Sequence, residues 1–470
     1  MIEVVNPGDD LLYVKKVIQK CFIEVDETGT KAAACEESDE DMGYSIWDPP
    51  PPNPRFVADH PFMFMIREDT SQAVFFMGVV ATRILLDDAH NGFKDGNFVC
   101  SPFSLETVLG MLAAGAEGET LEQLLEFLGH ETVDHLLSDS PSAKLLAQLF
   151  SDTDSREAGL EIVLANGIWV DKKLITRVQS RYKEVLQCVY KTEAKFVDFE
   201  NMPHGSAKNI NSWVNEKTRG LIPTIVDGGD LKDDVVIALV NALYFKGLWS
   251  KPFDAKKTKV KDFHLVNGET VSIPFMTSQK QFNYGCFEGC KILQIPYESE
   301  GQSNEFSMYI FLPDRKDGLQ ELLKVFHSDP ALFHEDFYLE PRFLEKLWIP
   351  KFKISCAFEA DNAVKQMGLT LPFKRTNKEF RRIVQPTGPE DNIYVSKILH
   401  KSFIEIDETG TEAAAVSCLF MGLPGCTAYC PPPPPPARFV ADHPFLFMIR
   451  EVTSQAVFFI GVVLNPHATD

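Results

Sequence analysis

Val235-Val-Ile-Ala-Leu-Val-Asn-Ala-Leu-Tyr-Phe-Lys246, followed by Gly-Leu-Trp249, is the stretch that decides the fold of this chain. Branched and aromatic residues fill the run, and such residues are typical of β-strands. We predict further strands in three runs of the same character, at 165–171, 306–313 and 347–354.

Two helices are predicted ahead of these strands. Ser101-Pro-Phe-Ser-Leu-Glu106 supplies Ser and Pro, which are helix-start signals, and small and apolar residues continue to Ala116. A second helical stretch covers 120–128. Because helices and strands are mixed without a regular alternation, the sequence favours an α+β fold over a doubly wound sheet.

The composition limits the range of functions. With 470 residues, 44% of them apolar and 24% charged, the chain is globular and can bury a large core. The net charge of −21 argues against nucleic acid or an anionic membrane as partner, because binding to phosphates depends on clustered Lys and Arg.

Targeting and cofactor signals are missing from the sequence. It contains neither an apolar run long enough for a membrane span nor a secretory signal, so we expect a cytoplasmic protein, with action outside the cell left open. The 10 scattered cysteines fit a reducing compartment. Because they lack nearby histidines in a zinc pattern and no glycine-rich phosphate loop occurs, we expect neither a metal nor a cofactor.

The beginning of the chain imperfectly repeats its end. Residues 13–34 match 394–415, and residues 55–80 match 438–463, with 38 identities in 48 positions. Two copies so far apart do not form a repeat array, which needs many short units in contact. We therefore predict a domain at 81–470 preceded by an extra copy of its C-terminal segment at 1–80, partly disordered or loosely attached.

Two motifs in the chain resemble those of the serpin family. Asn241 to Trp249, followed by Pro252-Phe-Asp, resembles the third strand of the central serpin sheet, and Phe439-Val-Ala-Asp-His-Pro-Phe-Leu-Phe447 resembles the C-terminal signature. The resemblance covers about 85–470 and is strongest to plant-type intracellular serpins. Further matches fall in the family's order and spacing: Asn211-Ser-Trp-Val, Thr218-Arg-Gly-Leu-Ile, Ile349-Pro-Lys-Phe-Lys-Ile-Ser and Glu408-Thr-Gly-Thr-Glu-Ala-Ala-Ala.

This resemblance implies a fold and a function. The implied fold is a large central mixed sheet with additional sheets, about eight to nine helices and an exposed reactive loop at about 408–438. The implied function is not enzymatic: the protein would inhibit serine endopeptidases, and also papain-like cysteine proteases, as a suicide substrate whose cleaved loop inserts into the central sheet. The alternative is a serpin-fold protein that does not inhibit proteases because its bait residue is defective, and that serves instead as a binding or storage protein.

Loop insertion requires a flexible hinge and side chains that can enter a packed sheet. By the family pattern, alternate residues from Thr411 to Met421 face inward, and none of them is charged. In the N-terminal copy, Glu36 and Glu40 would occupy such positions, so that loop should not insert, because burying an unpaired carboxylate is costly. The hinge residues are Gly410, Thr411, Glu412, Ala413, Ala414 and Ala415.

The resemblance also implies a hydrogen-bonded shutter, formed by Ser101, Ser104, Asn241 and His400 beneath the central strands, with Trp249 at the breach where loop entry begins. Buried Asn and His side chains need partners. A Ser/His pair is present, but the sequence shows no third, orienting carboxylate, so we predict no catalytic triad.

The reactive bond departs from the family pattern. Counting from the hinge glycine as in plant serpins, the resemblance implies that the residue presented to the protease is Pro424 and that the bond is Pro424–Gly425. Proline has a fixed φ and no N–H, and fits most primary specificity pockets poorly. Met421 and Tyr429 are alternatives, but each changes the length of the inserted segment by several residues.

The two copies compete for the same strands of the family topology. We expect the C-terminal copy to occupy them, since it has His400 where the N-terminal copy has Gln19. Serpins begin with a helix near the start of the chain. Here the N-terminal copy replaces part of that region, and we expect only a shortened helix, Ala81-Thr-Arg-Ile-Leu-Leu-Asp-Asp88. We expect a monomer that binds serine or cysteine endopeptidases. The alternative is that the N-terminal copy lends strands to another molecule, which would give a strand-swapped oligomer.

Overall fold

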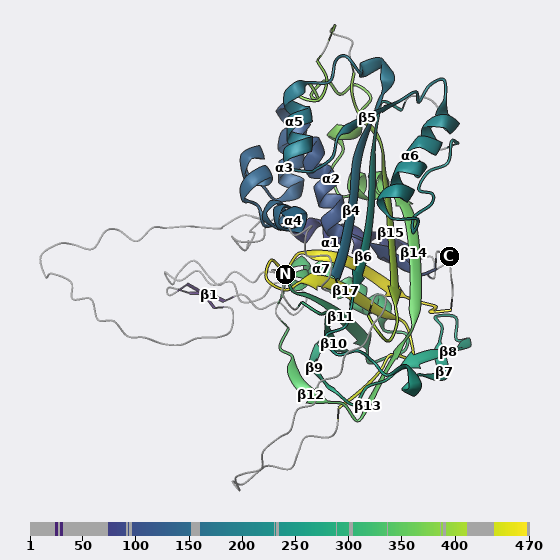
Figure 1. Ribbon diagram of the computed structural model, residues 1–470. Helices are drawn as coiled ribbons and strands as arrows, with labels where there is room; N and C mark the ends of the chain where they lie inside the picture. The colour runs from purple at the N-terminus through teal and green to yellow at the C-terminus, as the bar shows by residue number, and fades with distance from the viewer. Residues whose placement is uncertain are drawn as a thin grey trace, which may run out of the picture. The chain divides into compact units, whose positions relative to one another are not determined.

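A computed structural model gives the fold of the chain (Figure 1). It describes Glu24–Asp26, Gly29–Lys31 and residues 74–467. Within the long range, the residues left undescribed are 91–92, 94–95, 152–159, 230, 232–234, 288, 300–303, 336, 386, 389–391 and 411–436.

The chain divides into two units, Met1–Arg67 and Glu68–Asp470. In the first unit the described residues form one antiparallel pair of short strands, β1 (Glu24–Asp26) and β2 (Gly29–Lys31). All the other described elements belong to the second unit.

A five-stranded mixed sheet contains the predicted strand 235–246 at its centre. Strand β15 runs parallel to β6, and β4 runs parallel to β5, whereas the other two pairs are antiparallel. In spatial order the strands are β14 (Phe352–Glu359), β15 (Val395–Ile406), β6 (Ile237–Gly247), β4 (Leu160–Asp171) and β5 (Ala194–Val197).

Two further sheets complete the β-structure of the second unit. The first is antiparallel, with the order β12 (Glu340–Phe343), β9 (Gln281–Phe287), β10 (Cys290–Pro296), β11 (Phe306–Pro313), β17 (Phe445–Glu451), β18 (Val457–Val463) and β3 (Phe98–Cys100). The second has the order β16 (Arg438–Val440), β13 (Lys346–Pro350), β8 (Thr270–Met276) and β7 (Lys259–His264).

Eight α-helices occur in the described residues, together with short 3-10 and π turns. The α-helices are α1 (Val74–His90), α2 (Pro102–Gly115), α3 (Gly118–Leu128), α4 (Pro141–Ser151), α5 (Ser180–Cys188), α6 (Pro203–Lys217), α7 (Leu319–Ser328) and α8 (Asp361–Gln366). The turns are η1 (His135–Asp139), η3 (Lys172–Leu174), η4 (Ala255–Lys257), η5 (Pro330–Phe333) and η6 (Leu371–Phe373).

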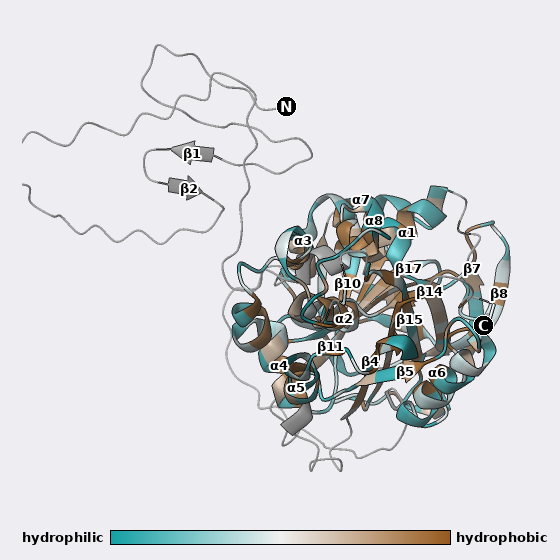
Figure 2. Ribbon diagram, turned by 90° about the horizontal axis from the view of Figure 1, so that it is seen from above, coloured by the Kyte–Doolittle hydropathy of each residue, from teal (hydrophilic) through white to brown (hydrophobic). Residues whose placement is uncertain are grey.

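Helix α2 begins as the sequence predicts and lies in the core. The Ser101 hydroxyl accepts a hydrogen bond from the Ser104 N–H, and Pro102 occupies the first helical position, where no partner for a backbone N–H is needed. Every residue of α2 is buried. The hydrophobic colouring of α2 and of the sheet strands in Figure 2 shows the same core.

Helices cover both faces of the five-stranded sheet (Figure 1). Successive side chains of a strand point to opposite faces. Leu239 and Leu243 of β6 pack in the main core with residues of α2, whereas Val240 and Ala242 pack with Ile210 of α6. The face of a β6 or β15 residue therefore follows from its place in this alternation.

The predicted α+β class and the predicted mixed sheet with additional sheets are confirmed, with differences in two elements. The predicted strand 347–354 is two strands, β13 and β14, in different sheets. The chain changes sheets at Lys351, whose N–H donates to the Pro274 carbonyl at 3.0 Å. Helix α1 begins at Val74, well before the expected Ala81, so its first turns consist of residues from the N-terminal copy.

The C-terminal copy provides the strands for which the two copies compete. Strands β15, β16, β17 and β18 all come from residues 395–463, and β15, β17 and β18 are each paired on both sides. Among the described residues, these strand positions belong to the C-terminal copy.

Candidate functional site at the seam between two parallel strands

The candidate site follows the line where β15 meets β6, which we term the seam. His400 of β15 lies directly opposite Asn241 of β6, and Asn241 in turn lies opposite Asn166 of β4. Three buried polar side chains therefore share one level across three adjacent strands.

The structure brings the four predicted shutter residues together at this level. The amide nitrogen of Asn241 donates to the backbone and side-chain oxygens of Ser104, and also to the side-chain oxygen of Asn166. The amide oxygen of Asn241 contacts Nδ1 of His400. The backbone N–H of Ser101 donates to Nε2 of His400 at 3.0 Å. The network ties the start of α2 to both strands of the seam.

His400 is neutral in this network. Its side chain is fully buried, and burial lowers its pKa to about 3. Because Nε2 accepts from the Ser101 N–H, the ring proton lies on Nδ1 and is donated to the Asn241 oxygen. The Ser402 hydroxyl lies 2.9 Å from Nε2.

Trp249 closes the end of the seam that lies next to the predicted loop. Its indole N–H donates to the Asp407 carbonyl at 3.0 Å, and its backbone N–H donates to the Thr409 carbonyl at 3.0 Å. The indole is almost fully buried and stacks on Tyr297, with the ring centroids 4.5 Å apart. These two hydrogen bonds hold Asp407 and Thr409, which follow β15, next to the end of β6.

Gly410 is the last described residue before the loop, and its position admits only glycine. Its φ of +139° is disfavoured for other residues. A side chain there would also collide with the backbone, since an added Cβ would lie 2.7 Å from the Leu248 Cα. The Asp407 carboxylate accepts the N–H groups of Thr409 at 2.8 Å and of Gly410 at 3.2 Å, which fixes the turn.

An ion pair beside the hinge was not predicted from the sequence. Glu408 is buried, and its carboxylate accepts hydrogen bonds from Lys351 at 2.7 Å and from the Thr258 hydroxyl at 2.6 Å. Burial opposes ionisation of Glu408, but the bonds from Lys351 and Thr258 outweigh it and lower the pKa. The Glu408 carbonyl accepts from the Phe253 N–H at 2.8 Å. Glu408 therefore anchors the chain just ahead of the hinge.

Sequence signals existed for some of the missed residues. Asp407 and Glu408 belong to the Asp-Glu-Thr-Gly run that occurs unchanged in both copies, a hint that these carboxylates have a role. Asn166 and Ser402 complete the shutter. Each is a buried polar residue, which requires a partner. The partner of Asn166 lies on another strand and could not be identified from local sequence, whereas Ser402 contacts His400 two residues earlier on its own strand.

Several predicted site residues lie outside the described residues. These are the hinge residues after Gly410, the proposed reactive bond and its alternatives: Thr411, Glu412, Ala413, Ala414, Ala415, Met421, Pro424, Gly425 and Tyr429. In the described ranges, no helix is long and apolar enough to cross a membrane. No cluster of three or more potential metal-ligating side chains occurs there either.

Comparison with known proteins identifies the class to which this fold and seam belong. The family model for serpins (serine protease inhibitors) matches residues 3–83 and, separately, 84–466. Among curated proteins, Serpin-Z10 of Arabidopsis thaliana is 40% identical over 79% of this chain and 92% of its own length. Serpin-Z7 of Hordeum vulgare is 38% identical over 79% of this chain and 90% of its own length.

Solved structures agree with this class. The structure of Arabidopsis AtSerpin1 in its native stressed conformation superposes with a TM-score of 0.75 at 32% identity, covering 86% of this chain and all of that one. The chain therefore belongs to the serpin family of serine protease inhibitors, and its relatives make it a serpin of the plant type.

Proposed function

We propose that the protein inhibits serine endopeptidases as a suicide substrate, by inserting its cleaved loop between β6 and β15. One observation carries this proposal: β15 pairs with β6 as far as Phe403, and Gly410 then forms a bridge with Leu248 just before the proposed loop. Polar contacts hold the seam closed at His400 and at Trp249. A strand that enters the seam can take over the backbone hydrogen bonds of both neighbours, so insertion leaves more strand pairs than before.

Opening the seam separates the shutter residues of the two strands. Insertion must break the contact between His400 and Asn241, whereas the contacts of Asn241 with Ser104 and Asn166 remain on one side. The groups that separate are neutral, so opening exposes no buried charge at this level, and each lost hydrogen bond costs about 1 kcal/mol. The shutter thus acts in the proposal as a modest barrier to opening.

The Glu408 anchor would have a related role. Its bonds to Lys351 and Thr258 hold the residues before Gly410 at the end of the seam where Trp249 lies. With one end of the loop fixed there, cleavage would free only the other end, and insertion would start from the hinge. The small residues from Thr411 to Ala415 suit such a hinge.

The reactive bond in this proposal is Pro424–Gly425. A second candidate function, a non-inhibitory binding or storage protein, is favoured by Pro424 itself, because a proline at the reactive position disfavours recognition. Papain-like cysteine proteases are additional candidate targets. Met421 and Tyr429 are the alternatives to Pro424 at the cleaved bond.

The test mixes the full chain with trypsin-, chymotrypsin- and papain-like proteases and looks for a covalent complex on a denaturing gel. The proposal predicts a complex that survives boiling in detergent, and sequencing of the released fragment would locate the bond within 421–430. Cleavage of the loop without a complex, and with no gain in heat resistance, would favour the non-inhibitory function.

Two loop variants sharpen this test. Pro424→Arg offers a residue that trypsin-like pockets accept, and should raise the yield of the trypsin complex. Pro424→Arg combined with Ala413→Glu places a charge on the face that would be buried, so the protein should be cleaved without trapping the protease. An equal yield from both variants would contradict loop insertion and leave only tight binding to explain inhibition.

A further inference from the structure

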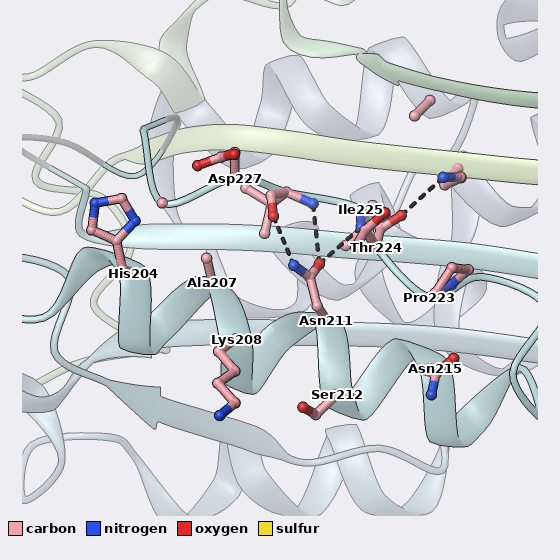
Figure 3. Close-up of a pocket in the computed structure, with 14 residues that line it drawn as sticks. His204, Ala207, Lys208, Asn211, Ser212, Asn215, Pro223, Thr224, Ile225 and Asp227 are labelled. Atoms are coloured by element: carbon pink, nitrogen blue, oxygen red, sulfur yellow. Dashed lines mark hydrogen bonds between the residues drawn. The ribbon is translucent and has the colours of Figure 1, made fainter. Parts of the chain in front are cut away.

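A cavity of about 720 Å³ lies on the face of the five-stranded sheet that α6 covers. Its lining comes from α6, from the segment that leads from α6 toward β6, and from Ala357 of β14 and Lys401 of β15 (Figure 3). The shutter lies on the opposite face, among the contacts of α2, so the cavity is a separate site.

Lys401 places a partly desolvated ammonium at this cavity. The residue is half-buried, and burial is the main reason that its pKa is lowered. Its Nζ donates to the Thr224 carbonyl at 2.9 Å. An ammonium has three donors, and none of the ion pairs in the described ranges involves Lys401. A half-buried cation without a counter-ion is unfavourable, and a bound anion would relieve this cost.

The other charges around the cavity also favour an anion. Lys208 and His204 line it from α6, and Asp227 is the single acidic residue among the described lining residues. The Asp227 carboxylate accepts the Gly229 N–H at 3.0 Å in its own turn. Basic residues thus outnumber acidic ones at this site in a chain whose net charge is −21.

The wall opposite the sheet is held in place by Asn211. Its side chain points from α6 to the adjoining segment (Figure 3), where its oxygen accepts the Ile225 N–H at 2.8 Å and its nitrogen donates to the Val226 carbonyl at 2.8 Å. The lining also has an apolar part, from Pro223, Ile225 and Ala207. A volume of this size lies in the range typical of small-molecule sites.

We propose that this cavity binds a small organic monocarboxylate, with the carboxylate on Lys401 and the carbon skeleton over Ala357 against Pro223 and Ile225. Ala357 lies directly opposite Lys401 in the sheet, and its short side chain leaves room beside the ammonium. The ligand would connect β15 to the segment that precedes β6. If the loop inserts at the seam, as in the proposed function, an occupied site would slow insertion.

Calorimetric titration of the full chain tests the site directly, with benzoate as the probe and benzamide as its neutral counterpart of the same shape. Saturable binding of benzoate is expected, with benzamide at least about tenfold weaker, because a hydrogen bond to a charged group is worth more than one to a neutral group. Equal binding of the two, or no binding of benzoate, would overturn the proposal.

Three variants distinguish the contribution of the Lys401 charge from that of the free volume above Ala357. Lys401→Gln removes the cation, Ala357→Leu fills the floor while leaving the cation, and each should weaken benzoate binding at least about tenfold. Lys397→Gln is the matched control on the same strand, because the Lys397 ammonium is paired with Glu359 and does not line the cavity. Benzoate binding that survives both cavity variants, or that is lost equally in the control, would contradict the assignment. No protease enters the assay, so a failure of inhibition would leave this result unaffected.

Discussion

Two nearly identical octapeptides of this chain adopt different secondary structures. Ala73-Val-Phe-Phe-Met-Gly-Val-Val80 and Ala456-Val-Phe-Phe-Ile-Gly-Val-Val463 differ at one position. Residues 74–80 form the first turns of α1, whereas residues 457–463 form β18. Intrinsic preference cannot account for this difference, because it is almost the same for the two segments.

Neighbouring elements account for it instead. Strand β18 is buried along its whole length and pairs with β17, and at Ile460–Val462 it also pairs with β3 on its other side. Helix α1 continues into Thr82-Arg-Ile-Leu-Leu and packs against α7, α2 and η5. The strand positions are already filled by the C-terminal copy, and the N-terminal octapeptide extends a helix, where its backbone groups bond to one another.

The same substitution in both copies would separate the two environments with the largest effect. In Gly461→Ala the added carbon would meet the Phe98 carbonyl oxygen and would lie 2.7 Å from the Phe447 ring, which fits a loss of about 3 kcal/mol or more. In Gly78→Ala the carbon would lie 2.6 Å from the Phe333 ring, but a gain in helix preference of about 1 kcal/mol offsets part of the cost.

Chemical denaturation of both glycine variants measures this difference. The strand variant should lose clearly more free energy of unfolding than the helix variant. Equal losses would mean that the two glycines have similar surroundings. That result would contradict the explanation that neighbouring elements distinguish α1 from β18.

A second exchange gives the C-terminal copy the residue of the N-terminal copy. His400→Gln corresponds to the Gln19 of the N-terminal copy and leaves the Ser101 N–H or the Asn241 oxygen without its present partner. We expect a loss of about 2 kcal/mol, the cost of leaving a buried group unsatisfied. The melting temperature of His400→Gln, with Lys397→Gln as control, checks this. A variant as stable as the parent would show that Gln rebuilds the network and that the choice between the copies does not depend on His400.

Sequence reasoning succeeded where local pattern and burial agree. The cap at Ser101, the apolar run of β6 and the order of the family motifs each predicted an element that the structure contains. It failed where the outcome depends on a neighbour distant in sequence. The octapeptide at 73–80 has no local signal for a helix, and Glu408 is a buried ion-pair residue only because Lys351 lies at the change of sheets.

The pH dependence of stability offers a smaller test of the same exchange. Burial lowers the pKa of His400 to about 3, so between that pH and the ordinary value of 6.5 the unfolded chain binds more protons than the folded one. The stabilising contribution of neutral His400 is therefore complete above pH 6.5 and falls as the pH falls below it. His400→Gln should flatten this part of the profile.

Another buried group makes a matched comparison with the parent necessary. Burial raises the pKa of Glu106 on α2 to about 7. Its contribution has the opposite sign, since stability falls as the pH rises from 4.5 through 7. The difference in free energy of unfolding between His400→Gln and the parent at each pH isolates His400. A difference that stays constant from pH 4 to pH 7 would contradict a buried, neutral imidazole.

The smallest effect is expected from the single position at which the octapeptides differ. Met77→Ile makes the helical segment identical to β18 in sequence, and the lower helix preference of isoleucine is worth about 0.5 kcal/mol. If neighbours decide the conformation, residues 74–80 of this variant must remain helical even though the same seven residues form a strand elsewhere in the chain. Hydrogen exchange of the amides in 78–82 would show this, because a helix keeps them protected while conversion to a strand without a partner would expose them. Loss of that protection would mean that one side chain, and not the surroundings, selects helix over strand.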